Sequence, residues 1–426
     1  MILIDTALHR IQKENRPIRV GLAGAGFAAR GFALQLLTGI PGMKLVAISN
    51  RTTSYAQLAY EQAGIFQTEL ITNADQLKKA IAEKKSVIVN DPVLLCDSPD
   101  IDVIVEATGE VEFGARVVTR AIQNKKHVVL INAELDTTLG PILKTYADKA
   151  GVIYTQADGD QPAVLMNLYR YVQTLGFKPV MAGNIKSLID CRRTPATQEK
   201  WAAEHFQRPK MVTSFADGTK ISFEMATIAN ATGFRVTKRG MEGPKCNHVD
   251  EAYKLFSLEK LMNGGIVDYI LGAQPSFGVF ILGFSDNPIK QQYMNVYKMG
   301  NGPLYTFYTP YHLSPLEAPL SVARAVLFGD AALAPLKPVC DVVTLAKRDL
   351  KKGETLDGIG GFTCYGAIDN YDGMIQEDLL PMGLSDGCVL KQDIPMDKAI
   401  TFDDVILPEN RLADKLWKKQ KEMFYE

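Results

Sequence analysis

The sequence has little histidine and no clustered cysteine, which limits the metal and disulfide chemistry open to it. Five histidines and six cysteines are spread over 426 residues, and no two cysteines stand at Cys-x-x-Cys spacing. We therefore expect no zinc site built from His and Cys alone, although carboxylate metal sites stay open. A chain of this length folds without disulfides, so we expect reduced cysteines and a cytoplasmic protein.

Long apolar runs and an excess of one charge are also missing. No run approaches the ~20 apolar residues that span a bilayer, and the first residues indicate an amphipathic helix, not a secretory signal. Lys and Arg number 47 against 48 Asp and Glu, so the bulk charge favours neither nucleic acid nor anionic lipid. We therefore expect no nucleic acid and no membrane as partner.

Buried strands alternate with helices in the first third of the chain. The apolar segment 18–23 predicts the first strand, because a strand buried on both faces is a nearly continuous apolar run. Further strands are expected at 44–50, 86–90, 101–106, 127–131 and 152–155, and helices at 27–37, 53–64, 112–124 and 138–150. This alternation predicts an α/β fold with a doubly wound parallel sheet.

A glycine-rich turn follows the first strand. Gly24, Gly26 and Ala29 form a Gly-x-Gly-x-x-Ala motif between that strand and the next helix. The first glycine permits a tight turn, the second lets the backbone approach a pyrophosphate, and the alanine permits close packing of helix on strand. The context predicts a dinucleotide site, and the alternative is a plain glycine-rich turn.

The end of the second strand bears on which dinucleotide binds. An NAD site usually has Asp or Glu there, whereas this strand ends in Asn50 and Arg51. No carboxylate would repel a 2′-phosphate and Arg51 can pair with one, so we expect NADP(H), with NAD as the alternative. The other residues expected at the cofactor are Phe27, Ala28, Thr52, Ala107, Thr108, Gly109, Asn132 and Ala133.

The pattern becomes mixed after residue 160, which indicates an α+β region. Expected there are helices at 162–175, 218–232 and 317–328, a strand at 179–185, a polar segment at 190–216 and aromatic β-like segments over 266–312. We therefore expect an NADP-binding Rossmann domain over 1–160, completed by the helix 317–330, a catalytic and oligomerisation domain over 161–316, and a small β-rich domain over 335–426.

Several of these segments resemble the homoserine dehydrogenases. The resemblance lies in the glycine turn, in the VEATG at 105–109, in the strand-end Asn132, and in the helices 218–233 and 319–326. Residues 339–407 resemble an SAF (antifreeze-like) domain, and the joined architecture is similar to the deoxyxylulose-phosphate reductoisomerase-like (DRL) group. The resemblance implies an NAD(P)-dependent oxidoreductase that works as a homodimer.

The helix 218–233 resembles the catalytic helix of that family with its charges reversed. The family has an Asp and, four residues on, a Lys, where this sequence has Lys220 and Glu224, and the family's Lys after the strand-end Asn is replaced by Ala133. Residues four apart share a helix face, so both charged groups can reach one substrate. We expect Lys220 to protonate or polarise a carbonyl oxygen; the alternative is a surface ion pair.

Two further groups of polar residues are candidates for the site. Asp158 and Asp160 are candidate catalytic residues and, with Glu224, candidate ligands of Mg²⁺ or Mn²⁺, although an Asp-Gly turn is the alternative. Four residues that follow or end a predicted strand can hold an anionic substrate by charge-assisted hydrogen bonds, unless they face solvent: Asn184, Lys186, Arg192 and Arg193. Lys186 is also a candidate for catalysis.

These features predict an NADP(H)-dependent oxidoreductase that acts on a CH–OH or C=O group of a small polar substrate. The resemblance favours a reductoisomerase of the type that converts deoxyxylulose phosphate to methylerythritol phosphate. Two alternatives stay open. One is a dehydrogenase of a hydroxy acid or sugar acid in carbohydrate catabolism, and the other is an NADPH-binding sensor that has lost catalysis.

Overall fold

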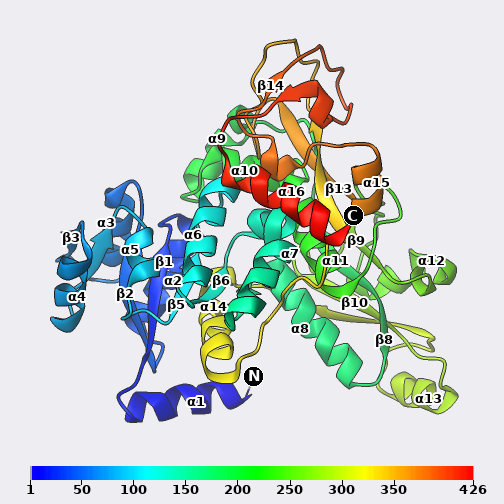
Figure 1. Ribbon diagram of the computed structural model, residues 1–426. Coiled ribbons are helices and arrows are strands. Elements are labelled where there is room, and N and C mark those ends of the chain that lie inside the picture. The colour runs from blue at the N-terminus through cyan, green and yellow to red at the C-terminus, as the bar shows by residue number, and fades with distance from the viewer. Residues whose placement is uncertain (1, 426) are drawn as a thin grey trace. The chain divides into compact units, whose positions relative to one another are not determined.

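The computed structural model describes residues 2–425 and divides the chain into two compact units. Unit 1 holds the described residues of Met1–Ala163, Leu313–Ala334 and Leu412–Glu426, and unit 2 holds Val164–His312 and Pro335–Arg411. In Figure 1 the three pieces of unit 1 are therefore blue to blue-green, yellow and red. Among residues 2–425, no helix combines the length and the apolar character needed to cross a membrane.

Unit 1 is built around a seven-stranded sheet with the order β3-β4-β2-β1-β5-β6-β7. The strands are β1 (Ile18–Ala23), β2 (Met43–Ser49), β3 (Glu69–Ile71), β4 (Val87–Val89), β5 (Val103–Glu106), β6 (His127–Leu130) and β7 (Tyr154–Gln156). All neighbouring strands are parallel. The predicted α/β fold is therefore confirmed. The strand order reverses between β1 and β5, the point where such sheets bind ligands.

Helices connect and cover these strands. They are α1 (Ile2–Lys13), α2 (Phe27–Thr38), α3 (Thr53–Gln62), α4 (Ala74–Ala82), α5 (Val93–Asp97), α6 (Val111–Gln123), α7 (Ala133–Ala150), α14 (Ser314–Ala323) with the π-helical turn Arg324–Phe328, and α16 (Leu412–Phe424). The strands are apolar because both faces are covered: Val20 and Leu22 in β1 and Val103 and Val105 in β5 are fully buried. Helix α14 groups with the N-terminal residues and contacts α2.

The last segment of the chain, for which no helix or strand was predicted, forms helix α16 and packs on α6 and α7. Within α7, Pro141 has no N–H, and Ile142 N–H bonds outside the helix. The buried amide of Gln420 fills this gap in the ladder: its Oε1 accepts from Ile142 N at 3.1 Å and its Nε2 donates to Thr138 O at 3.0 Å. The side chain thus replaces one intrahelical hydrogen bond.

Unit 2 contains a four-stranded sheet with the order β11-β10-β8-β9. The strands are β8 (Lys178–Lys186), β9 (Ile266–Leu271), β10 (Val279–Phe284) and β11 (Leu304–Thr309). The neighbouring helices are α8 (Gln161–Thr174), α9 (Pro195–Glu204), α10 (Pro209–Ala216), α11 (Thr219–Thr232), the 3₁₀ turn Val249–Lys254, α12 (Leu258–Met262) and α13 (Pro288–Val296). Strands β8 and β9 are parallel, and the other two pairs are antiparallel.

Two parts of unit 2 are more helical than expected. The polar segment 190–216 folds into α9 and α10, and α13 interrupts the predicted β region. The sequence does hold local signals for these three helices. Each begins with a proline, at a position where the missing N–H has no cost: Pro195, Pro209 and Pro288. Thr194 and Asn287 precede two of them at the N-cap, a position that favours such residues.

Residues 335–411 belong to unit 2 and do not form a compact unit of their own. They contain the hairpin β12 (Cys340–Ala346) and β13 (Cys364–Asn370), then α15 (Tyr371–Gln376), the 3₁₀ turns Met382–Leu384 and Phe402–Asp404, and the short pair β14 (Val389–Leu390) and β15 (Val405–Ile406). Both long strands pack on α11. The segment expected as a third domain is thus divided: 335–411 packs against α11, and α16 returns to unit 1.

Candidate functional site

The glycine turn after β1 has the backbone geometry of a phosphate-binding turn. Gly24 has φ +112, and a Cβ added to it would lie 2.5 Å from Ala107 O, so only glycine fits. A Cβ added to Gly26 would meet no atom within 4 Å, which leaves its backbone open to a ligand. Gly26 caps α2, whose first N–H groups have no acceptor in the helix, and the first intrahelical bond is Arg30 N to Gly26 O.

The residues expected at the cofactor differ in burial and backbone conformation. Ala29 is fully buried and permits α2 to lie close to the sheet, whereas Phe27 is exposed and Ala28 partly buried. Gly109 follows β5 with φ +70. Ala133 is the first, fully buried residue of α7.

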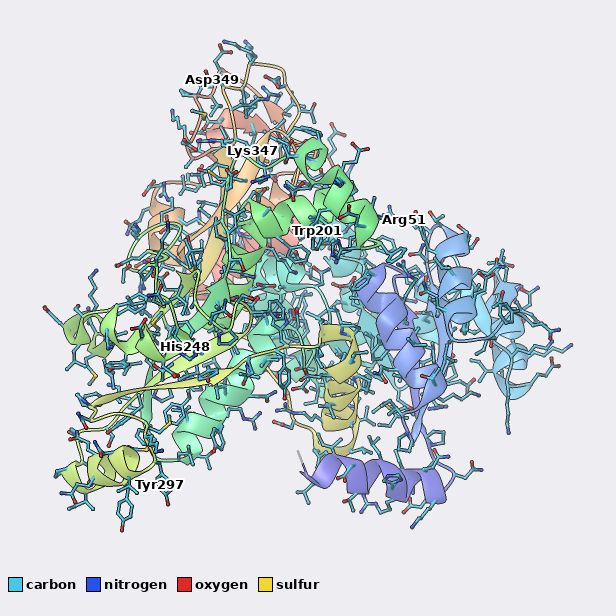
Figure 2. The ribbon with its side chains drawn as sticks, turned by 180° about the vertical axis from the view of Figure 1, so that it is seen from behind. Arg51, Trp201, His248, Tyr297, Lys347 and Asp349 are labelled. Atoms are coloured by element: carbon cyan, nitrogen blue, oxygen red, sulfur yellow. The ribbon has the colours of Figure 1, made fainter. Side chains whose placement is uncertain are left out.

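Arg51 lies just beyond β2 (Figure 2). Its guanidinium already has a carboxylate partner. Its Nη2 is 2.7 Å from Oε1 of Glu110, and its Cζ lies 5.0 Å from the ring centre of Phe113. The side chains of this ion pair are 65% and 51% exposed, so water screens it. Asn50 Nδ2 donates to Thr52 O at 2.7 Å and shapes the turn before α3. An anion at Arg51 would have to compete with Glu110.

Glu106, the last residue of β5, is a buried carboxyl group in the VEATG segment, and the sequence analysis gave it no role of its own. Its Oε1 accepts from Thr108 N at 2.8 Å and from the Thr108 hydroxyl, and its Oε2 accepts from Asn132 Nδ2 at 2.8 Å. Asn132 Oδ1 in turn accepts from Leu135 N and caps α7. Burial raises the pKa of Glu106 to about 7, against the hydrogen bonds that lower it. The group therefore joins the ends of β5 and β6 that were expected to hold cofactor.

The loop after β7 holds Asp158 in a network with α14. Ser321 Oγ donates to Asp158 Oδ2 at 2.7 Å, and Arg324 Nη1 lies 3.1 Å from Asp158 Oδ1. Asp160, two residues on, is also buried. Asp158 thus has a cationic partner within unit 1, which is what a structural role for this carboxylate requires. Its proposed parts in catalysis and in metal binding stay predictions.

Helix α11 brings the other predicted catalytic residues together in unit 2. Every residue from Thr219 to Ala231 is buried, including Lys220 and Glu224, which lie one turn apart. Lys186, at the end of β8, places its Nζ 3.8 Å from Glu224 Oε2. The alternative of a solvent-exposed Lys220–Glu224 pair is therefore wrong, because both side chains are buried. Lys220 shares a helix face with Glu224, and Glu224 lies beside Lys186. We call these three residues the lysine cluster: Lys186, Lys220 and Glu224.

Asn184 lies two residues before Lys186 and thus on the same face of β8. It is buried, and its Nδ2 has no hydrogen-bond partner among the residues that the structure describes. A buried amide without an acceptor costs free energy, and a ligand oxygen would remove that cost. Asn184 and Lys186 therefore remain together as candidates for binding a substrate.

Arg192 and Arg193 each have a protein partner, and both side chains also remain open to solvent. Arg192 pairs with Asp397 and donates to Lys347 O at 2.7 Å, and Arg193 Nε lies 3.0 Å from Asp190 Oδ2. Their predicted role at an anionic substrate is not tested by these contacts. Nothing in the local sequence signals the partner of Arg192, because it lies 205 residues further along the chain.

Within residues 2–425, no group of three or more His, Cys, Asp or Glu side chains is arranged to hold a metal ion. Asp158 and Glu224 are instead paired with Arg324 and Lys186. All six cysteines are free thiols.

Comparisons with known proteins match parts of the sequence to oxidoreductases. Residues 159–318 match the family model of the catalytic domain of oxidoreductase DRL. A stretch of 81 residues is 33% identical to homoserine dehydrogenase of Bacillus subtilis, and it covers 19% of this chain and 19% of that enzyme. The aligned part is thus about a fifth of the curated relative's length.

Solved structures with a similar arrangement are remote in sequence. A myo-inositol dehydrogenase from Corynebacterium glutamicum is 13% identical, with 74% of this chain and 89% of that chain covered and a TM-score of 0.42. A putative myo-inositol dehydrogenase from Sinorhizobium meliloti is 11% identical, with 74% and 90% covered and a TM-score of 0.41. A probable dehydrogenase from Thermotoga maritima is 14% identical, with 68% and 75% covered and a TM-score of 0.38.

The resemblance stated from the sequence is confirmed where the family model matches. The SAF-like reading of 339–407 stays a prediction. Over residues 159–318, the segment that carries the lysine cluster, this chain resembles the catalytic domain of oxidoreductase DRL.

Proposed function

We propose that this protein is an NADP(H)-dependent oxidoreductase that acts on a CH–OH or C=O group of a small polar substrate. The observation that carries the proposal is the largely buried lysine cluster on α11 and β8, inside the segment that matches an oxidoreductase catalytic domain. Lys220 and Glu224 are buried and the Lys186 side chain is only 17% exposed. Charged groups held this far from water are costly to maintain unless they are paired and used.

The glycine turn of unit 1 fits a dinucleotide. Gly24 makes the turn that no other residue could make, and the open backbone at Gly26 and the start of α2 offers N–H groups to a pyrophosphate. Arg51, with no carboxylate at the end of β2, supports NADP(H) over NAD(H). A bound nicotinamide ring would supply or take up the hydride.

The lysine cluster supplies the proton chemistry in this proposal. In the direction of reduction, Lys220 gives a proton to the substrate oxygen as the carbon gains a hydride, and then regains a proton from solvent. Lys186 and Glu224 hold neighbouring oxygens of the substrate, the first as donor and the second as acceptor. With Asn184 Nδ2 as a further donor, this set suits a substrate with several hydroxyl or acidic oxygens.

The test begins with a substrate screen and ends with Lys220→Met. Purified protein is mixed with NADPH or NADP⁺, with and without Mg²⁺ or Mn²⁺, and with sugar acids, hydroxy acids, inositols, homoserine and deoxyxylulose phosphate. For a substrate that is turned over, Lys220→Met should lower kcat by about 10²- to 10⁴-fold, the usual contribution of general acid catalysis. NADPH binding should not change.

Lys254→Met is the matched control, because Lys254 forms an exposed pair with Glu251 in the same unit. Retained turnover in Lys220→Met would refute the role of Lys220. Tight NADPH binding without turnover of any compound would favour the alternative of a sensor.

A second candidate function is the reductoisomerase reaction, which the resemblance of the sequence to the DRL group implies. It differs from simple dehydrogenation because the carbon skeleton is rearranged. Mass and NMR analysis of the product from deoxyxylulose phosphate separates the two, since only the reductoisomerase yields a branched product. A metal requirement in the same assay would support Mg²⁺ or Mn²⁺ as a further cofactor.

We also propose that the protein is a cytoplasmic homodimer. The six free thiols support a reducing compartment. Light scattering of the purified protein tests the dimer, and a monomer at micromolar concentration would refute it.

A further inference from the structure

The first turn of α11 carries Lys220 and is held by an unusual cap. The N-cap residue Gly218 has φ +88 and offers no side chain, so it cannot cap the helix itself. Asp217 does so from one position earlier, because its Oδ1 accepts from Thr219 N at 2.9 Å. The position of this turn therefore depends on how the Asp217 carboxylate is fixed.

The Asp217 carboxylate is fixed by Lys347, which follows β12 in the C-terminal part of unit 2 (Figure 2). Lys347 Nζ lies 2.9 Å from Asp217 Oδ2, and the two side chains are 2% and 0% exposed. The same ammonium group donates to Arg193 O and to Gly361 O, each at 2.8 Å. Its three N–H bonds are thus used by three different segments of unit 2.

Because the Asp217–Lys347 pair is buried, removing only one of its two charges is costly. Burial raises the pKa of Asp217, and Lys347 opposes that shift. Loss of the ammonium would leave a buried carboxylate beside the start of α11, which costs more free energy than the intact pair provides. An apolar contact in the same place would not orient the carboxylate toward Thr219 N.

A second anchor joins the same turn to β13. Gly366 N donates to Thr219 Oγ1 at 2.8 Å, and Ser222 Oγ donates to Gly366 O at 3.3 Å. Further along the helix, Asn230 Oδ1 accepts from Val339 N and Cys340 N at 2.7 and 3.0 Å. Helix α11 is therefore bound to the C-terminal residues along its whole length, and most firmly at the turn that carries Lys220.

We propose that Lys347 is a positioning residue for the reaction: through Asp217 and Thr219 it sets the place of Lys220, so residues 335–411 serve as the support of the catalytic helix. The inference rests on the proposed role of Lys220. A catalytic group that moves by about 1 Å can lose roughly 10²-fold in rate. A small displacement of the first turn is therefore enough to be measured.

The experiment uses the full-length protein with two variants at this pair. Asp217→Asn keeps an acceptor for Thr219 N but removes the charge that holds Lys347. The double variant Asp217→Asn/Lys347→Met removes both charges, and such neutral replacements of a buried pair usually fold. Lys351→Met is the control, because Lys351 forms an exposed pair with Asp393 in the same segment.

We expect kcat of the double variant to fall at least tenfold, while KM and the Kd for NADPH stay within threefold of the wild type. The primary isotope effect with NADPH deuterated at the transferred position should rise, since hydride transfer becomes slower. A merely structural role would lower the amount of folded enzyme and leave this isotope effect unchanged.

Equal kcat in the double variant and in Lys351→Met, with both folded, would overturn the inference. The experiment can refute the positioning role of Lys347 without refuting the proposed function, and the reverse. If Lys220→Met retains turnover, the role of Lys220 is wrong whatever Lys347 does. If Lys220→Met is inactive and the double variant is fully active, only the positioning role is wrong.

Discussion

Arg51 gives a direct test of the cofactor preference. A 2′-phosphate carries about −1.5 to −2 charges and presents three acceptor oxygens, whereas a 2′-hydroxyl carries none of this charge. A hydrogen bond to a charged group contributes roughly 1.5–3 kcal/mol. Because the Arg51 side chain is 65% exposed, screening reduces this to about 1–2 kcal/mol, which is roughly 5- to 30-fold in Kd.

We therefore expect Arg51→Ala to raise the Kd for NADPH by that factor and to leave the Kd for NADH within twofold. Glu110 competes for the same guanidinium at 2.7 Å. Glu110→Gln should tighten NADPH binding, by at most about fivefold, because exposed ion pairs contribute no more than about 1 kcal/mol. Both effects should shrink at high salt, since salt screens exposed charges.

The assay is a titration of nucleotide fluorescence with each variant and each dinucleotide. Arg116→Ala is the control, because Arg116 is a similarly exposed arginine on α6, paired with Glu112 at 2.7 Å. If Arg51→Ala weakens both dinucleotides equally, or neither, then Arg51 does not read the 2′-phosphate. The preference for NADP(H) would then need another origin.

Two further predictions concern stability. Gln420→Leu should lower the free energy of unfolding by about 3 kcal/mol, because two backbone groups of α7 lose their buried partner at about 1–3 kcal/mol each; a melting temperature equal to that of the surface control Lys418→Ala would contradict this. Glu106 keeps its proton to about pH 7 in the folded state but only to about 4.5 when unfolded, so its contribution to stability is fully present below pH 4.5 and is lost as the pH rises through 7. In urea unfolding, the free energy of unfolding of the wild type should therefore fall by about 2.5 kcal/mol more than that of Glu106→Gln between pH 5 and pH 8, whereas parallel pH profiles would show that Glu106 titrates normally.

The sheet of unit 1 and its glycine turn were predictable because their signals are local. The strand at 18–23 was predicted with the bounds that β1 has in the structure. A strand buried on both faces has to be apolar, and a turn with φ +112 has to be glycine. The reversed charges on α11 were also visible in the sequence, as was their common face.

The sequence could not show which partner each charged side chain has. Arg192 was expected at an anionic substrate, yet its guanidinium contacts Asp397, 205 residues away. Glu106 ends a buried strand, but only the folded structure shows that Thr108 and Asn132 hold its carboxyl group. Such contacts leave no periodic pattern along the chain.

By itself the sequence determined a doubly wound parallel sheet, a dinucleotide-type glycine turn and a helix with Lys220 and Glu224 on one face. These features follow from hydrophobic period and backbone conformation, which act over a few residues. Tertiary structure alone decided that residues 335–411 support α11, that Lys347 meets Asp217 across 130 residues, and that Gln420 completes α7 from 282 residues beyond Thr138. Those contacts exist because a buried charge or backbone group needs a partner, and only the folded chain determines which segment provides it.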